Sequence, residues 1–482
     1  MAAAAASFAS LPAYAEAATS HGRVYRVGVT LTTQDLAARL SPRPALHFHR
    51  GTPRRGKVIR VDENATYQSM DGFGAAMTDS SAWLIGTQLA PDARAELMNE
   101  FFGPGGLRLN AVRIPMGASD FTRDGIPYSY DDAPLGLSDP AMAFFSVAHD
   151  RSYVLPLLRQ MMALNPRVAT LANPWSPPPW MKSNRSASNR DGKGKLNRSA
   201  YGPLARYFVR FLRAYAAEGV PIRAITPQNE PGVESLYPGL NLPPAEEARF
   251  VGDHLAPALR AAGLHPRIYG LDHNWASRLY ARPLLRAPRA AAALSGIAWH
   301  CYHGDPRAMS ELHAMAPRLK QVVTECSSPL APAPTAELVI AAARNWASSV
   351  QLWNLALNGH TGPVQLPNNG CYHCQGLVEI DTPSGRVTRG RDFYQLGQAS
   401  RFVQPGARRI GSNSFVSYQS GRSFTRSYAT SGVDNVAFRN PDGRRVLLLY
   451  NNSTRRRSFL IAWRGRVLRY ALPGRASATL TW

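Results

Sequence analysis

Short apolar runs alternate with longer amphipathic stretches between about residues 68 and 395, and this rhythm restricts the fold more than any other feature of the chain. Runs of strand length separated by segments of helical periodicity are typical of βα units around a parallel sheet. Eight such runs occur, at residues 70–79, 109–121, 168–180, 222–231, 268–274, 297–304, 321–327 and 350–357. Between them, segments such as 201–218 place apolar residues at steps of three and four on one helical face. The pattern predicts an α/β fold, a closed (β/α)8 TIM barrel.

The segments outside this span have a different character. Residues 24–33, residues 57–61 and the chain after Phe402 read as short alternating strands divided by Gly, Asn, Asp and Ser. This pattern predicts an all-β, sandwich-like side domain assembled from both termini. The predicted organisation is a signal-like or disordered segment at 1–23, the side domain from 24–66 and 396–482, and the barrel at 67–395.

The N-terminal segment bears on where the protein works. Residues 1–20 are mostly small and apolar, contain no Lys or Arg, and include Ala-x-Ala patterns at 13–15 and 15–17. These features are typical of the end of a secretory signal, but the basic region that begins such a signal is missing. The interpretation is a secreted or periplasmic protein, with a disordered tail on a cytoplasmic protein as the alternative. No stretch of about 18 apolar residues occurs, so no transmembrane segment is expected.

Basic residues outnumber acidic ones, with 55 Lys and Arg against 32 Asp and Glu and a formal net charge of +23. The cations are scattered, and the longest basic run is 455–457. Two interpretations remain, a drift of composition towards arginine or peripheral attraction to anionic surfaces. No zinc-finger spacing, RNP-type aromatic motif or basic heptad accompanies the charge, so no nucleic-acid partner is expected.

Four cysteines are too few for a disulfide scaffold. Cys371 and Cys374 form a Cys-x-x-Cys pair, which suits either a tight disulfide that pins a loop or two free thiols. A zinc site is not predicted, because no second Cys-x-x-Cys pair accompanies the first. We expect neither a metal nor an organic cofactor.

Two glutamates follow apolar runs on opposite sides of the predicted barrel. Glu230 ends the fourth run, within Gln-Asn-Glu-Pro, and Glu325 ends the seventh. Active sites of TIM barrels lie at the C-terminal ends of the strands, so both glutamates are expected at one barrel mouth. Glycoside hydrolysis needs one carboxyl group to protonate the leaving oxygen and a second to meet the oxocarbenium ion, and retaining enzymes hold the two about 5–5.5 Å apart. The pair predicts a retaining glycosidase, although either glutamate alone would fit a surface acid.

Aromatic and polar residues near other strand ends support a sugar-binding pocket. Sugars stack their apolar faces on rings, while their hydroxyl groups bond to amides and carboxylates. Arg113 and His300 lie inside apolar runs, where they could orient a catalytic carboxylate or serve as satisfied core residues. The predicted pocket residues are Asp120, Trp175, Trp180, Tyr302 and Trp353.

Several of these segments resemble glycoside hydrolase family 30, and within it the glucosylceramidase-like and endo-β-1,6-glucanase-like branch. The matching segments are 70–79 (MDGFGAAMTD), 113–121 (RIPMGASDF), 174–182 (PWSPPPWMK), 228–231 (QNEP), 324–326 (TEC) and 353–357 (WNLAL). They occur in the family's order, and the resemblance runs from about residue 65 to the C-terminus. It implies a TIM barrel with a side β-domain, net retention, and no metal or organic cofactor.

The same resemblance assigns roles to individual residues. It implies that Glu230 is the acid/base, that Glu325 is the nucleophile, and that Asn229 contacts the sugar 2-hydroxyl. The residues that would line the glycone pocket are Asp120, Trp175, Tyr302 and Trp353. Segments 236–244 and 368–375, together with Cys301, depart from the human-type glucosylceramidase pattern, which leaves the leaving group open.

The expected reaction is hydrolysis of β-glucosidic bonds, in glucosylceramide or β-1,6-glucan, by double displacement. The alternatives are another β-glycoside, such as a β-xyloside, β-fucoside or glucuronoxylan, and a carbohydrate-binding protein without catalysis. The loops on the leaving-group side lack a regular aromatic series, so we expect exo action or few subsites. Glu230 is expected to hold a proton near neutral pH, because the charge of Glu325 disfavours a second carboxylate.

Overall fold

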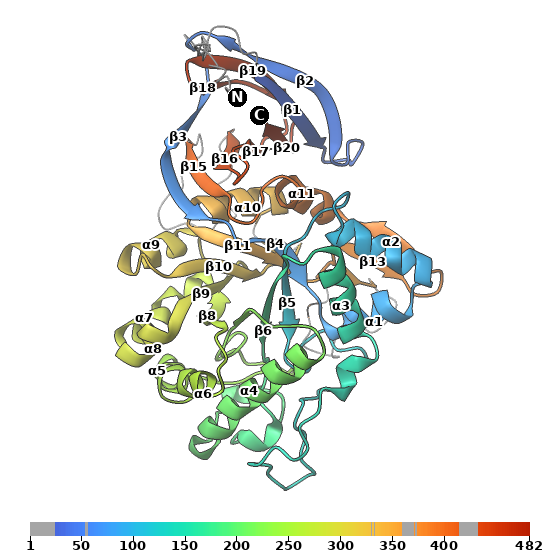
Figure 1. Ribbon diagram of the computed structural model, residues 1–482, viewed down its shortest axis with the longest axis vertical. Coiled ribbons are helices and arrows are strands. Elements are labelled where there is room, and N and C mark those ends of the chain that lie inside the picture. The colour runs from blue at the N-terminus through green and yellow to red at the C-terminus, as the bar shows by residue number, and fades with distance from the viewer. Residues whose placement is uncertain are drawn as a thin grey trace, which may run out of the picture.

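The computed structural model describes residues 25–53, 56–328, 330–331, 333–358, 371, 374–413 and 432–482. These residues form a larger body of helices around a central sheet and a smaller body of strands, which lies at the top of Figure 1. The first and last described strands both belong to the smaller body.

A closed barrel of eight parallel strands forms the centre of the larger body, in the order β10-β11-β4-β5-β6-β7-β8-β9. The strands are β4 (Gly72–Ala76), β5 (Ala111–Pro115), β6 (Ala169–Asn173), β7 (Ala224–Ile225), β8 (Arg267–Asn274), β9 (Leu294–His300), β10 (Lys320–Glu325) and β11 (Ala347–Leu352). Each predicted apolar run contains or overlaps one of them, so the predicted TIM barrel is confirmed. Five successive strands contribute one interior layer, Leu171, Ala224, Tyr269, Ala298 and Val322. The barrel is therefore a packed core rather than a pore.

Helices surround this barrel (Figure 1). They are α1 (Asp79–Thr87), α2 (Pro91–Phe102), α3 (Val154–Leu164), α4 (Tyr201–Ala217), α5 (Pro244–Arg249), α6 (Ala256–Ala261), α7 (Ala281–Arg286), α8 (Pro288–Ala293), α9 (Arg307–Met315), α10 (Thr335–Arg344) and α11 (Arg391–Ser400). In α4, Tyr207, Phe208, Phe211 and Tyr215 are fully buried, which is the apolar face that the sequence predicts. A small sheet of β12 (Ala356–Leu357), β13 (Val378–Asp381) and β14 (Arg386–Arg389) lies beside the barrel.

The smaller body is a second closed ring of strands built from both ends of the chain, in the order β1-β2-β19-β18-β3-β15-β16-β17-β20. Its strands are β1 (Tyr25–Thr32), β2 (Ser41–Arg50), β3 (Val58–Ser69), β15 (Arg408–Ser412), β16 (Val433–Arg439), β17 (Arg445–Asn451), β18 (Arg457–Trp463), β19 (Arg466–Leu472) and β20 (Ser477–Thr481). The first strand pairs directly with the last, and Val29 lies opposite Leu480. The predicted all-β domain from both termini is thereby confirmed.

Helix α11 joins the two bodies through buried hydrogen bonds. Gln398 Nε2 donates to Thr32 Oγ1 on β1 at 2.8 Å, and Thr479 Oγ1 on β20 donates to the Gln398 carbonyl oxygen at 2.6 Å. Both strands of the terminal pair thus contact the last barrel helix. In the part of the chain that the structure describes, no helix has the length and apolarity needed to cross a membrane.

A chain that ends at residue 400 is expected to be insoluble or unfolded. It lacks β15 to β20, so β1 loses the partner that covers Val27, Val29 and Leu31, and two or three leftover strands do not form a stable sheet. The measurement is gel filtration with circular dichroism, and co-expression of residues 401–482 as a separate chain should restore soluble protein. A soluble, fully active 1–400 chain would contradict this prediction.

Candidate active site

The two predicted catalytic glutamates lie at the C-terminal mouth of the barrel. Glu325 is the last residue of β10, whereas Glu230 follows β7 in a left-handed backbone conformation, with a φ of 42°. The Glu230 N–H donates to the Asp272 carbonyl oxygen at 3.0 Å, which holds this unusual conformation in place. Both carboxylates line one cavity of about 400 Å³.

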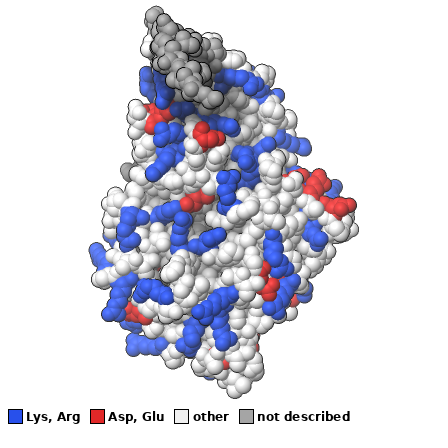
Figure 2. Space-filling model, in the orientation of Figure 1, with Lys and Arg blue, Asp and Glu red and all other residues white. Residues whose placement is uncertain are grey.

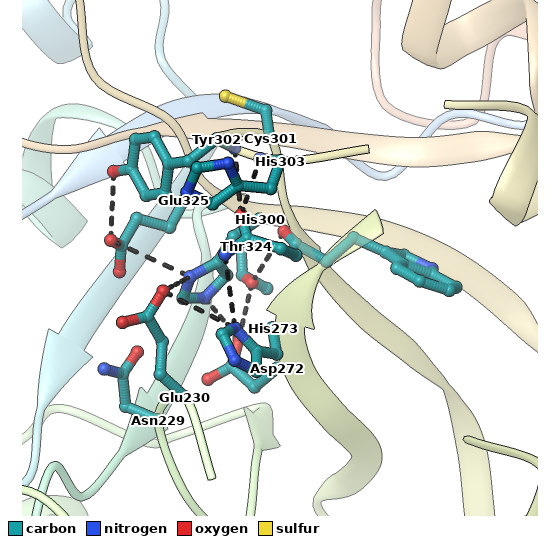
Figure 3. Close-up of polar contacts among 12 residues, drawn as sticks. Asn229, Glu230, Asp272, His273, His300, Cys301, Tyr302, His303, Thr324 and Glu325 are labelled. Carbon is teal, nitrogen blue, oxygen red and sulfur yellow. Dashed lines mark hydrogen bonds and ion pairs between the residues drawn. The ribbon is translucent and has the colours of Figure 1, made fainter. Parts of the chain in front are cut away.

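His300, the last residue of β9, contacts both glutamates. Its Nδ1 atom lies 3.0 Å from Glu230 Oε1 and 3.8 Å from Glu325 Oε1. Figure 3 shows both carboxylates next to this imidazole. The sequence left His300 as either an orienting or a core residue, and the structure places it, fully buried, between the two carboxylates.

Every residue predicted for the sugar pocket except Trp180 gathers around these glutamates. Asp120, Tyr302 and Trp353 line the cavity, and the Tyr302 hydroxyl donates to Glu325 Oε1 at 3.0 Å. Trp175 stacks on Trp353 with ring centroids 4.9 Å apart, so it supports the wall from behind. The Oδ1 atom of Asp120 is buried and has no hydrogen-bond partner among the described residues, so it can accept a bond from a ligand.

Trp180 does not contribute to the cavity. Its Nε1 donates to the Asp131 carbonyl oxygen at 3.2 Å, away from the lining residues. The pocket role that the sequence suggested for Trp180 is therefore wrong. A Trp near a strand end also serves as core packing, and here its polar atom is satisfied within the fold.

Arg113, on β5, fixes the carboxylate of Glu325. Its Nη1 donates to Glu325 Oε2, and its Nη2 donates to Asn229 Oδ1 at 2.7 Å. The guanidinium is fully buried and lies 4.6 Å from the centroid of the Trp175 ring. This arrangement resolves the open alternative for Arg113, because the residue holds Glu325 and Asn229 in register.

Asp272, on β8, was missed by the sequence analysis. It is fully buried and accepts hydrogen bonds from groups on five other strands or their ends. The donors are Arg113 Nη2 at 2.9 Å, Asn173 Nδ2 at 2.9 Å, Thr226 Oγ1 at 2.7 Å, Thr324 Oγ1 at 2.6 Å and His300 Nε2 at 3.2 Å. The sequence feature that could have indicated Asp272 is an acid inside the apolar run 268–274, because an unpaired charge buried there would be costly.

The electrostatics of the site correct one expectation. Burial raises the pKa of the Glu230 carboxyl, but hydrogen bonds and charge from His273 and His300 outweigh burial, so the pKa lies below its ordinary value. Burial lowers the pKa of His300, whereas the charge of Glu325 and bonds to Asp272 and Glu230 raise it to about 10. The resting proton therefore lies on His300, and the expectation that Glu325 keeps Glu230 protonated is wrong.

Asp120 has the opposite shift. Burial, followed by the charges of Glu325 and Glu230, raises its pKa well above the ordinary value. A protonated Asp120 can donate as well as accept, which suits contact with a sugar hydroxyl group.

All four cysteines are paired in disulfides. Cys371 and Cys374 form one bond at the edge of the cavity, which decides between the two alternatives left by the sequence. Cys301 and Cys326 form a second bond between the chain segments that follow β9 and β10. That pairing was not anticipated, since 25 positions separate its members.

Comparison with known proteins gives a consistent result. The family model of the glycosyl hydrolase family 30 TIM-barrel domain matches residues 70–403, and that of the glycosyl hydrolase family 30 beta sandwich domain matches residues 406–480. The endo-1,6-beta-D-glucanase neg1 of Aspergillus fumigatus is 33% identical over 411 residues, which cover 82% of this chain and 81% of that protein. The lysosomal acid glucosylceramidase of Mus musculus is 27% identical over 440 residues, covering 83% and 78% respectively.

Solved structures share the whole two-body architecture. SrfJ from Salmonella typhimurium superimposes with a TM-score of 0.85 at 25% identity, covering 95% of this chain and 99% of that one. The endo-beta1,6-glucanase BT3312 superimposes with a TM-score of 0.80 at 28% identity, with the same coverage.

Proposed function

Because this chain belongs to glycoside hydrolase family 30, we propose that it cleaves β-1,6-linked glucan, with Glu230 as the acid/base and Glu325 as the nucleophile. The chain is a retaining β-glycosidase, as this family membership entails. The observation that supports this pair of glutamates is the single nitrogen of His300, which lies close to both carboxylates. Two carboxyl groups that share so close a neighbour fit the separation of about 5–5.5 Å between the catalytic carboxyl groups of retaining enzymes. They fit the roughly 6.5–9.5 Å of inverting enzymes less well.

In the first step, a Glu325 oxygen attacks the anomeric carbon while Glu230 protonates the leaving oxygen. Arg113 and the Tyr302 hydroxyl each hold one oxygen of Glu325, so the nucleophile is oriented before the sugar arrives. Glu230 obtains its proton through its hydrogen bond with His300. The transfer is local, because a hydrogen bond of 3.0 Å joins the imidazole directly to the carboxylate.

In the second step, water displaces Glu325 from the anomeric carbon, and Glu230 removes a proton from that water. Two displacements at the same carbon restore the β configuration. We infer that Asn229, which Arg113 holds next to Glu230, bonds the sugar 2-hydroxyl, and that Asp120 and Trp353 contact the same sugar ring from the cavity wall.

The side chains next to Glu230 favour a glucan over glucosylceramide, although Val233, Tyr237 and Leu330 also line the cavity. His273, Asn274 and His303 line the cavity next to Glu230, which faces the leaving group. Imidazole and amide groups suit the hydroxyls of a second sugar, whereas ceramide needs an apolar wall. The relatives that are 33% and 32% identical are endo-1,6-β-glucanases, so we propose endo action in place of the exo action expected from the loops.

Linear β-1,6-glucan is expected to be cut faster than glucosylceramide in detergent micelles, and oligosaccharides should appear before glucose. The leaving-group side then binds sugar residues, as the imidazole and amide groups next to Glu230 suggest. Chromatography of early products gives the answer, and aryl β-glycosides of glucose, xylose, fucose and galactose test the glycone. Glucose as the only early product would indicate exo action, and faster cleavage of glucosylceramide would favour the lipid substrate.

We further propose that the protein works outside the cytoplasm and contacts anionic surfaces there. Two disulfides suit an oxidising compartment, as do the small apolar residues at the N-terminus. Figure 2 shows Lys and Arg spread over the face in view, with few Asp and Glu among them. A surface of this sign attracts anionic polymers at low salt.

A further inference from the structure

Glu230, His273 and His300 form a compact group whose geometry resembles a metal-binding site. One carboxylate oxygen, Glu230 Oε1, lies 3.0 Å from His300 Nδ1 and 3.6 Å from His273 Nδ1. The three ligand atoms all lie within 4.8 Å of one another. Among the described residues, this is the one group of three or more His, Cys, Asp and Glu side chains with such spacing. Figure 3 shows the three side chains close together; His273 and His300 come from the ends of β8 and β9, and Glu230 from the loop after β7.

We propose that this group binds Zn²⁺ and that the bound ion inhibits the enzyme. Two imidazoles and one carboxylate form a zinc ligand set that proteins use when a fourth position stays open. Coordination by His300 Nδ1 displaces the proton that this imidazole holds at rest, and that proton is released to solvent. Zinc lies about 2.0–2.2 Å from such ligands, so neighbouring ligand atoms must be a little over 3 Å apart. The distances of 3.0 Å and 3.6 Å from Glu230 Oε1 to the two imidazoles are close to that spacing, and no two of the three ligand atoms are more than 4.8 Å apart.

Asp272 supplies the outer contact that such a site needs. Its Oδ1 lies 3.2 Å from His300 Nε2, which leaves His300 Nδ1 directed at Glu230. Histidines that bind metal usually donate their other ring N–H to a carboxylate in this way. Because Asp272 is fully buried and held by four further donors, this orientation is fixed before any ion arrives.

The fourth position opens to the substrate cavity. Glu230 and His273 both line that cavity, so water or a sugar hydroxyl can complete a tetrahedral shell. An ion at this point occupies the carboxylate oxygens of Glu230 and the space beside them. The inhibition rests on the proposed function, since the bound ion removes the acid/base from the reaction and blocks the leaving-group side of the cavity. Inhibition is therefore expected to be competitive with substrate and reversed by a chelator.

Calorimetric titration of the full chain with Zn²⁺ tests the proposal. The chain is produced without a histidine tag, and its disulfide-bonded cysteines offer no thiol to the ion. One ion should bind per chain at this site, and Co²⁺ should give the visible absorption of a tetrahedral complex with nitrogen and oxygen ligands. Substrate or a competitive inhibitor should weaken binding.

Two histidine variants, one near the C-terminal end of β8 and one before its start, separate this site from adventitious binding. His273→Gln keeps a polar side chain but removes one ligand, and zinc affinity should fall by at least the roughly 10–100-fold that loss of an outer contact costs. His265→Asn is the control, because His265 is exposed and lies before β8, at the opposite end of the barrel. The affinity of the His265→Asn chain for zinc should match that of the unaltered chain.

The results distinguish failure of the zinc site from failure of the proposed hydrolytic function. Equal zinc affinity in the unaltered and His273→Gln chains, or no binding at all, overturns the proposal even if the chain hydrolyses glucan. Tight binding that depends on His273, in a chain that shows no hydrolysis, supports the metal site and contradicts the proposed function. Zinc that binds but leaves hydrolysis unchanged overturns the inhibitory part.

Discussion

Glu325→Ala is expected to abolish turnover of every substrate, while Glu230→Ala is expected to keep its first step on a substrate with a good leaving group. In the proposed mechanism, Glu325 is the one group that forms a bond with the anomeric carbon, so the loss should be about four or more orders of magnitude. Glu230 contributes proton transfer, worth roughly 10²–10⁴-fold, and a dinitrophenyl leaving group does not need that proton. Burst kinetics with a dinitrophenyl β-glucoside measure both steps.

Azide separates the two roles by stereochemistry. In Glu230→Ala, azide needs no base and attacks the glycosyl-enzyme, so two inversions yield the β-glycosyl azide. In Glu325→Ala, azide attacks the substrate directly, and one inversion yields the α-azide. Nuclear magnetic resonance of the product distinguishes the two anomers. The α-azide from the Glu230 variant, or the β-azide from the Glu325 variant, would mean that the roles are reversed.

Glu234→Ala is the matched control for these variants. Glu234 lies four positions after Glu230 in the same loop, but it is exposed. The Glu234→Ala variant should hydrolyse substrate at the rate of the unaltered chain and form no glycosyl azide. Activity close to that of the unaltered chain in Glu230→Ala or Glu325→Ala would remove that residue from the mechanism.

The sequence was sufficient to locate both glutamates because barrel geometry converts order along the chain into position in space. Glu230 and Glu325 each follow an apolar run, and strand ends in a TIM barrel meet at one mouth. Asp120, Trp175, Tyr302 and Trp353 could be found by the same rule, since each lies shortly after the end of a barrel strand. Trp180 obeyed that rule as well, yet its indole is directed into the fold and bonded to Asp131.

Contacts between side chains of different strands could not be predicted in this way. Asp272 and His273 lie within a run that was interpreted as a plain strand, and their roles depend on donors far apart in sequence. The proton position depends on the same distances, because His273 and His300 act on Glu230 only through space. Strand β2 was missed for a different reason, since most of its residues are exposed and show no apolar alternation.

Asp272→Asn is expected to lower the free energy of unfolding by about 3–5 kcal/mol, because it removes one partner of a buried charged network. Asn offers an N–H₂ group in place of one oxygen, and that group then faces donors from Arg113, Thr226 and Asn173 instead of an acceptor. Arg113 is fully buried, so water cannot replace the lost charge. Urea unfolding followed by tryptophan fluorescence measures the change.

Activity should fall together with stability in this variant, but for a separate reason. Asp272 contacts both Arg113 and His300, and these two residues hold Glu325 and Glu230 respectively. Its loss should therefore lower kcat in chains that remain folded at low temperature, with a smaller effect on KM. An Asp272→Asn chain that unfolds early but keeps the original kcat would show that the network stabilises the fold without positioning the glutamates.

The control for stability is Asp253→Asn, which breaks the 3.0 Å ion pair with Arg289 on the protein surface. Exposed pairs of this kind contribute about 0–1 kcal/mol, so the unfolding curve should barely move. A double-mutant cycle with Arg113→Met then tests whether the large effect comes from the buried pair. If Arg113 and Asp272 depend on each other, the second substitution should cost less in the Asp272→Asn chain than in the unaltered one. Strictly additive costs would place the effect of Asp272 with its other donors, on β6, β7, β9 and β10, and would leave Arg113 to be held by Glu325 and Asn229 alone.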